Sequence, residues 1–230
     1  MILHGPLSNL DLVALGLLVL AWLGAGWVIE HPPASRPSVM VLMRRYRREW
    51  MRQFVTRQPR MFDSALIASL RQGATFFAST SLLAVGGALA VIGNPERLMS
   101  LTAELPIDRA PVLLWLGKVL VAALFAANAF LKFVWSHRLF GYASITMGAV
   151  PNEVTPQAYA RADQAADLLI TGARSYESGM RSVYFGLAAL VWLAGAWPLV
   201  AATVVATLVL LRREFASASR RALMHEDRPF

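Results

Sequence analysis

The feature that most constrains this chain is a set of long apolar runs that contain no charged residue. The longest covers residues 182–211, and two others cover residues 12–28 and 72–93. Roughly 20 consecutive apolar residues let a helix cross a bilayer. Only 16% of the residues are charged, against about 25% in soluble domains. The sequence therefore predicts an all-α, polytopic transmembrane helical bundle, with residues 1–230 forming one integral membrane domain.

The apolar runs predict about five membrane segments, of which the last two form a tight hairpin. As one helix, the run over residues 182–211 would be about 45 Å long, whereas the hydrocarbon core measures about 30 Å. Trp197 and Pro198 lie at its middle, so we expect a turn at residues 195–198. The two halves are short: they either cross fully, which we favour, or form a re-entrant hairpin. The expected segments cover residues 10–29, 72–93, 111–135, 180–196 and 198–213.

Two further stretches, residues 38–58 and 155–178, are predicted to form amphipathic helices at the cytoplasmic interface. In the first, a narrow apolar stripe lies opposite a basic face, which is typical of a helix in the headgroup plane. A nucleic-acid-binding helix would also be rich in arginine, but it would not need the stripe. The second helix begins with Thr155 as cap and Pro156 at the first helical position. The stripe of the first helix consists of Met43, Tyr46, Trp50 and Phe54.

The elements between these stretches follow from local signals. A helix is expected to begin near Phe62, with Asp63 or Ser64 as its cap, and to enter the segment over residues 72–93. The many small residues of that segment favour close helix packing in lipid, so we expect it to be central in the bundle. Residues 94–110 and 137–154 are expected to be polar connections.

The basic residues predict the orientation of the bundle. Of the 22 lysines and arginines, nine lie in residues 31–71, four in residues 136–181 and five from residue 212 onward. These 18 would all lie on one side of a five-segment bundle, and basic loops stay in the cytoplasm. We therefore expect the amino terminus outside and the carboxyl terminus in the cytoplasm. Residues 1–11 carry no lysine or arginine, which is unlike the positive start of a cleavable signal peptide.

The sequence shows no catalytic constellation. There is no cysteine, and no two of the four histidines have the spacing of metal or haem ligands on one helix. No phosphate-binding loop, nucleophile elbow or pair of intramembrane carboxylates is present. We therefore expect no catalytic residue, no metal, no cofactor and no enzymatic activity.

Two groups of polar residues are candidates for binding. The first is a polar intramembrane site of Lys118, Asn128 and Lys132, since ionisable groups in a membrane tend to face protein or water. Alternatively, the two lysines reach opposite interfaces and Asn128 bonds to another helix. The second is a cytoplasmic headgroup or partner site. It consists of Arg44, Arg47, Arg48, Trp50, Arg71, Trp135, Arg138 and Arg213.

Several runs of residues together resemble a known family. They are residues 44–51, Arg71 with residues 76–80, Asn128 with residues 132–138, Tyr142, and residues 212–215 with Ser217 and Ser219. Over nearly the whole chain, the sequence resembles an uncharacterised family of bacterial membrane proteins catalogued as domain of unknown function number 599. The resemblance implies a protein of the bacterial inner (cytoplasmic) membrane and supplies no reaction. Its shared positions Arg71, Asn128, Lys132, Trp135 and Arg138 are expected at the cytoplasmic half.

Two functions fit these observations. The first is a non-enzymatic membrane component whose basic cytoplasmic face binds anionic lipid headgroups, a protein partner or a second copy of the chain. The net charge of +8 is then explained by headgroups rather than by a nucleic acid. The second is a small-solute or ion transporter or channel, in which Lys118, Asn128 and Lys132 line a polar path. An intramembrane enzyme acting on a lipid has the least support, because no acid, base or nucleophile can be named.

Overall fold

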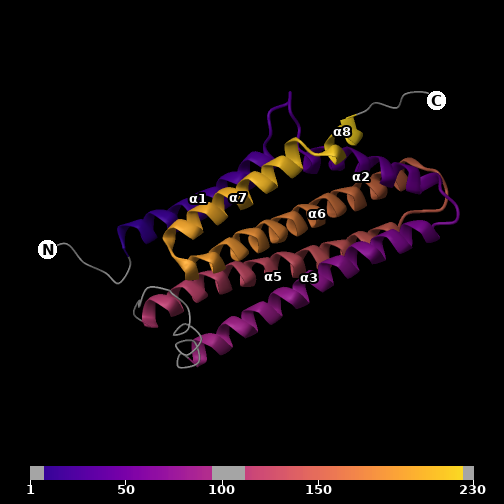
Figure 1. Cartoon of the computed structure of the whole chain (residues 1–230). Helices are drawn as coiled ribbons and strands as arrows, with labels where there is room; N and C mark the ends of the chain where they lie inside the picture. The colour runs from indigo at the N-terminus through magenta and orange to yellow at the C-terminus, as the bar shows by residue number, and fades with distance from the viewer. Residues whose placement is uncertain (1–7, 95–111, 225–230) are drawn as a thin grey trace.

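The computed structural model describes residues 8–94 and 112–224, and every regular element in these ranges is helical. The long helices lie side by side, as Figure 1 shows. Helices α1 and α7 pack together over α6, α6 packs on α5, and α5 packs on α3 at the other edge of the bundle. The helices are α1 (Asn9–Glu30), α2 (Val39–Thr56), α3 (Met61–Gly93), α5 (Val112–Gly148), α6 (Pro156–Val191), α7 (Ala196–Phe215) and α8 (Ala218–Met224), with a 3₁₀ turn η1 (Trp192–Ala194) before α7.

Three of the described helices, α1, α3 and α5, are long and apolar enough to cross a membrane. The prediction of an all-helical protein with membrane-type helices is therefore confirmed. The fourth and fifth expected segments, residues 180–196 and 198–213, are not among these three helices. The count of five membrane segments therefore stays a prediction. The polar connection expected over residues 94–110 lies, beyond Asn94, outside the described residues.

The apolar run over residues 182–211 doubles back as its length and Pro198 predicted, but the turn lies at residues 192–195 rather than 195–198. Helix α6 ends at Val191, η1 follows, and α7 begins at Ala196 and packs against α6. Gly195 has a φ of 123°, a left-handed conformation in which a side chain would be strained. The amide of Gly195 donates a hydrogen bond to the carbonyl of Trp192 at 2.9 Å. Gly195 therefore makes the turn possible.

Two predicted boundaries were wrong, because helices continue where loops or breaks were expected. Helix α5 runs through most of the loop expected at 137–154 and ends at Gly148. Helix α6 joins the expected interfacial helix and the fourth segment into one helix of 36 residues, which begins at the predicted cap Thr155. At 1.5 Å per residue, α5 and α6 are each about 55 Å long. They are therefore much longer than a hydrocarbon core of about 30 Å.

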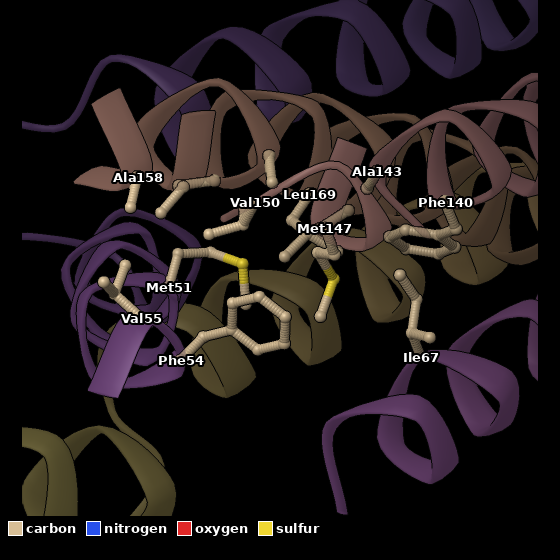
Figure 2. Close-up of a cluster of buried hydrophobic side chains, with 14 of the residues drawn as sticks. Met51, Phe54, Val55, Ile67, Phe140, Ala143, Met147, Val150, Ala158 and Leu169 are labelled. Atoms are coloured by element: carbon tan, nitrogen blue, oxygen red, sulfur yellow. The ribbon is translucent and has the colours of Figure 1, made fainter. Parts of the chain in front are cut away.

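The ends of α3, α5 and α6 that meet α2 form a compact apolar core, shown in Figure 2. Met51, Phe54 and Val55 of α2 are buried in it. Met147 contributes from α5, as does Leu169 from α6. Burial of this apolar surface stabilises the helical extension, which explains why α5 does not end at residue 136.

Two members of the predicted apolar stripe of α2 have different surroundings. Phe54 is buried against protein, whereas Tyr46 is 44% exposed. The buried part of α2 contacts α6 rather than lipid. The position of this helix in the headgroup plane, like that of residues 155–178, stays a prediction.

The expectation that residues 72–93 are central in the bundle was wrong. Helix α3 packs mainly on α5 and lies at the edge of the bundle, with large apolar side chains such as Leu83 exposed. Small residues permit close packing, but they do not specify how many neighbours a helix has.

Phenylalanines of α5 fit against glycines of α6. A Cβ atom added at Gly172 would lie 2.8 Å from the Phe140 ring, and one at Gly179 would lie 2.9 Å from the Phe133 ring. Both rings are buried, and the Phe133 ring also stacks on Phe77 of α3 at 5.4 Å between centroids. These contacts bring the axes of α5 and α6 close together and link them to α3.

Candidate functional site

A cavity of 340 Å³ lies where the end of α1, the start of α2, the middle of α6 and the end of α7 meet. Part of its wall is apolar and is formed by Ile29, Met180 and Leu210. Its charged lining consists of Glu177, Arg181, Arg213 and Glu214. The cavity therefore combines a hydrophobic side with two guanidinium and two carboxyl groups.

Arg181 is held in place by Glu30 at the end of α1. Its Nη2 donates a hydrogen bond to Glu30 Oε1 at 2.6 Å, and Arg174 Nε donates to Glu30 Oε2 at 2.7 Å. The side chain of Arg181 is 7% exposed. A Cβ atom added at Gly26 would lie 3.4 Å from Arg181 Nε. A glycine there leaves room for the guanidinium, and the charge of this buried arginine is compensated within the protein.

Glu214 joins the end of α7 to the first turn of α2. Its carboxylate accepts a hydrogen bond from the backbone N–H of Met40 at 3.0 Å. Carboxylates are favourable at this position, because the first N–H groups of a helix lack partners in the helix itself. Burial nevertheless raises the pKa of Glu214 above its ordinary value. Ser38 completes the junction by donating from Oγ to the carbonyl of Ile29 at 2.8 Å.

Glu177 is the charged group of the cavity without a direct partner. Within residues 8–94 and 112–224, its carboxyl group makes no hydrogen bond and no ion pair. It also borders a smaller space of 40 Å³ next to Arg44 and Arg47. Burial raises the pKa of Glu177 and the charge of Glu214 adds to this, whereas Arg181, Arg47 and Arg213 act in the opposite direction.

Arg213 lies on the exposed side of the cavity. Its Nη1 donates a hydrogen bond to the hydroxyl of Tyr184, and its guanidinium carbon lies 6.0 Å from the centre of that ring. Ser217 and Ser219, in the link to α8 and at its start, add two hydroxyl groups to the lining. A guanidinium carries five N–H donors, so Arg213 retains donors for a ligand.

The structure divides the predicted headgroup site into separate groups. Arg44, Arg47 and Arg213 lie around the two cavities just described. Arg48 forms an ion pair with Asp167 at 2.8 Å, and both side chains are more than half exposed. Such a surface pair contributes little to stability.

Trp50 is half-buried, and its indole N–H bonds within the protein. Its Nε1 donates a hydrogen bond to Asp63 Oδ1 at 2.6 Å, and Arg57 Nη1 donates to the same oxygen at 2.6 Å. Asp63 is fully buried.

The prediction that Asp63 or Ser64 caps α3 was wrong, since the N-cap is Arg60 and its side chain makes no cap bond.

Arg71, Trp135 and Arg138 lie on α3 and α5, away from the cavity. Arg71 Nη2 is 3.4 Å from His137 Nε2, and Arg138 Nη2 donates to the hydroxyl of Tyr142 at 3.1 Å. Arg138 also lies 6.0 Å from the centre of the Trp135 ring. The residues predicted as one cytoplasmic site therefore occupy at least two faces.

The three polar residues of α5 have different surroundings. Asn128 Nδ2 donates a hydrogen bond to Ser182 Oγ of α6 at 2.7 Å. Lys118 is buried, with its Nζ 5.6 Å from the Trp115 ring centre and 5.5 Å from that of Trp192. Lys132 is half-buried, four residues beyond Asn128 on the same helix. Asn128 therefore forms a hydrogen bond between two helices, as expected under the alternative to a polar path through the membrane.

Sequence reasoning missed the carboxyl groups of this site. Glu30, Glu177 and Glu214 lie just outside expected apolar segments, where an acidic side chain needs a partner. The spacing of Glu177 and Arg181 places both on one helical face. Asp11 was missed as well: it is buried and accepts a hydrogen bond from Trp192 Nε1 at 2.7 Å. Acidic residues at the ends of apolar runs were the signal that could have found them.

The described residues define a helical membrane-type protein whose charged cavity lies at the ends of several long helices. The chain belongs to the family described as protein of unknown function, DUF599, which matches residues 13–219. This range contains every charged residue of the cavity and confirms the resemblance found in the sequence. Comparison with curated proteins and with solved structures gave no match.

Proposed function

We propose that this protein is a non-enzymatic component of the bacterial inner membrane that binds a phospholipid headgroup in the cavity between α1, α2, α6 and α7. The observation that carries the proposal is the combined lining of the cavity. Ile29, Met180 and Leu210 provide an apolar wall, and Arg213 provides a cation with free donors. A phospholipid has an apolar acyl part, which would lie against the apolar wall, and a charged phosphate, which would bind the cation.

The expected membrane segments support this location. Residue 29 ends the first segment, residue 180 begins the fourth and residue 213 ends the fifth. The cavity therefore lies at the expected boundary between the hydrocarbon and the cytoplasm, where headgroups are found. Its volume of 340 Å³ is within the range of about 300–1,000 Å³ typical of small-molecule sites.

Arg213 is the residue we assign to the phosphate. Arg181 already forms an ion pair with Glu30, whereas the hydrogen bond of Arg213 goes to an uncharged hydroxyl. A guanidinium can bind two phosphate oxygens at once, and such charge-assisted bonds are the stronger ones. The hydroxyls of Ser217 and Ser219 provide further donors on the same side.

The alternative of a transporter through α5 has less support. The Asn128 amide already donates to Ser182, and Lys118 Nζ lies 5.6 and 5.5 Å from the centres of the Trp115 and Trp192 rings. A permeating solute would have to displace these contacts.

Native mass spectrometry of the purified protein, released gently from detergent, tests the proposal. We expect the wild type to retain phospholipid and Arg213→Gln to bind it roughly 10- to 100-fold more weakly, since a hydrogen bond to a charged group contributes about 1.5–3 kcal/mol. Arg212→Gln is the matched control, because Arg212 is the exposed neighbour and does not line the cavity. Equal retention by both variants would refute the assignment.

A further inference from the structure

Glu177 places a carboxyl group in the cavity that the protein itself does not pair. The neighbouring carboxylates differ in this respect: Glu30 binds two arginines and Glu214 accepts a hydrogen bond from a backbone N–H. Within the described part of the chain, Glu177 has neither kind of partner. Arg181, Arg47 and Arg213 lower the pKa of Glu177 without bonding to it, but burial and Glu214 still leave that pKa raised. The carboxylate charge is therefore only partly compensated, and a cationic group of a ligand that bonds to it directly would stabilise it further.

The charges around the cavity also argue against a purely anionic ligand. The lining contains two arginines and two glutamates, so its formal charge sums to zero. Arg181 is already paired with Glu30, so an anionic headgroup would be attracted mainly by Arg213 and repelled by Glu177 and Glu214. A headgroup with one negative and one positive group avoids this repulsion, because each group can lie beside its opposite.

The two unlike charges line the same cavity. Arg213 and Glu177 both line the cavity, from α7 and α6, and the charge of Arg213 lowers the pKa of Glu177. In a headgroup of the ethanolamine type, two carbon atoms separate the phosphate ester oxygen from the ammonium. A small cavity with a guanidinium and a carboxyl group matches this arrangement.

We infer that the cavity selects a zwitterionic aminophospholipid of the phosphatidylethanolamine type, with its phosphate on Arg213 and its primary ammonium on Glu177. The inference rests on the proposed function and deepens it. A primary ammonium carries three N–H donors that a carboxylate can accept. The trimethylammonium of a choline headgroup has none, and a glycerol headgroup has no positive charge. Both should therefore bind more weakly.

The surroundings of Glu177 predict how binding depends on pH. It is faced by Arg213 and Glu214 from α7, by Arg47 from α2, and by Arg181 and Tyr176 on its own helix. Burial raises its pKa, and a bound ammonium would lower it again. Binding should therefore release a proton from a protonated Glu177, and the affinity for the aminophospholipid should rise with pH.

A competition experiment tests the selectivity. The full chain is incubated with equal amounts of phosphatidylethanolamine, phosphatidylglycerol and phosphatidylcholine with identical acyl chains, and the retained lipids are counted by native mass spectrometry. We expect about tenfold enrichment of phosphatidylethanolamine on the wild type, since a lost charge-assisted contact of about 1.4 kcal/mol is a factor of ten. Glu177→Gln should keep lipid binding and lose the enrichment. Glu153→Gln, at an exposed position in the α5–α6 link, is the matched control and should keep both.

The outcomes separate the two ideas. If the wild type retains no phospholipid, the proposed function fails and the selectivity with it. If lipid is retained and depends on Arg213, but phosphatidylglycerol or phosphatidylcholine is retained as well as phosphatidylethanolamine, only the selectivity is overturned. The same holds if Glu177→Gln keeps the enrichment. A cooperative thermal unfolding curve of Glu177→Gln, with a melting temperature at pH 7 no lower than that of the wild type, shows that the variant is folded and that the result concerns binding.

Discussion

Replacing Gly179 by alanine tests how α5 and α6 pack. The added Cβ atom would lie 2.9 Å from both Cε1 and Cζ of Phe133. Favourable carbon–carbon contacts occur at about 3.5–4.0 Å, so either the ring or the helix must move by more than half an ångström. The Phe133 ring has little freedom to do so, because it is fully buried and packed between Phe77 and Tyr176.

The expected cost follows from two opposing effects. Adding a methyl group to a well-packed interior costs about 1–3 kcal/mol. Alanine is better than glycine in a helix by about 0.5–1 kcal/mol, which offsets part of this cost. The two ranges differ by about 0–2.5 kcal/mol, so we expect Gly179→Ala to lower the free energy of unfolding by about 1 kcal/mol. Gly117→Ala on α5 is the control: a Cβ atom there meets nothing within 4 Å, so stability should stay equal or increase slightly.

The measurement is unfolding of the purified protein in mixed micelles with increasing denaturing detergent, followed by tryptophan fluorescence. A second substitution, Phe133→Leu, should restore part of the loss in the Gly179→Ala background, because it removes the ring that the methyl group meets. Equal stability of Gly179→Ala and Gly117→Ala would show that α5 and α6 do not approach as closely as described.

Two further predictions concern buried carboxyl groups. Asp63→Ala removes the acceptor that Trp50 and Arg57 share and should destabilise the protein by about 2–3 kcal/mol in the same unfolding assay. Trp50→Phe removes only one donor and should cost about 1 kcal/mol. An Asp63→Ala protein as stable as the wild type would contradict this. The pKa of Glu177 is raised above 4.5 in the folded state, so its contribution to stability is fully present below pH 4.5 and is lost as the pH rises through the folded value. The melting temperature of the lipid-free wild type should therefore fall more steeply with rising pH than that of Glu177→Gln, and parallel curves would contradict the assignment.

Several features of the fold could be predicted because they depend on neighbouring residues alone. The length of the run over residues 182–211, together with Pro198, predicted its reversal. Thr155 followed by Pro156 predicted the start of α6, and the Thr155 side chain indeed accepts a hydrogen bond from the backbone N–H of Ala158. Caps, turns and apolar length are local properties, so a single sequence carries them.

The helical extension beyond the apolar segments could not be predicted in the same way. Residues 139–147 of α5 contain polar and aromatic side chains that are compatible with a loop. They are helical because Leu139, Phe140, Ala143 and Met147 are buried in the described structure. The faces that bury them belong to α6, which follows α5, and to α2 and α3, which are distant in the sequence.

The candidate site also has features that the sequence predicts and features that only the tertiary structure decides. From the sequence by itself we predicted that its charged residues share one end of the bundle, because the expected apolar segments set each position along the helix axes. The sequence did not determine which helices are neighbours around the bundle. Glu177 and Arg213 share a cavity, while Arg71 and Arg138 lie on another face, because α7 returns beside α6 and α1 whereas α3 packs on α5. That order arises from contacts between distant segments, such as the fit of Phe133 against Gly179 and of Arg181 against Glu30, and only the tertiary structure decides it.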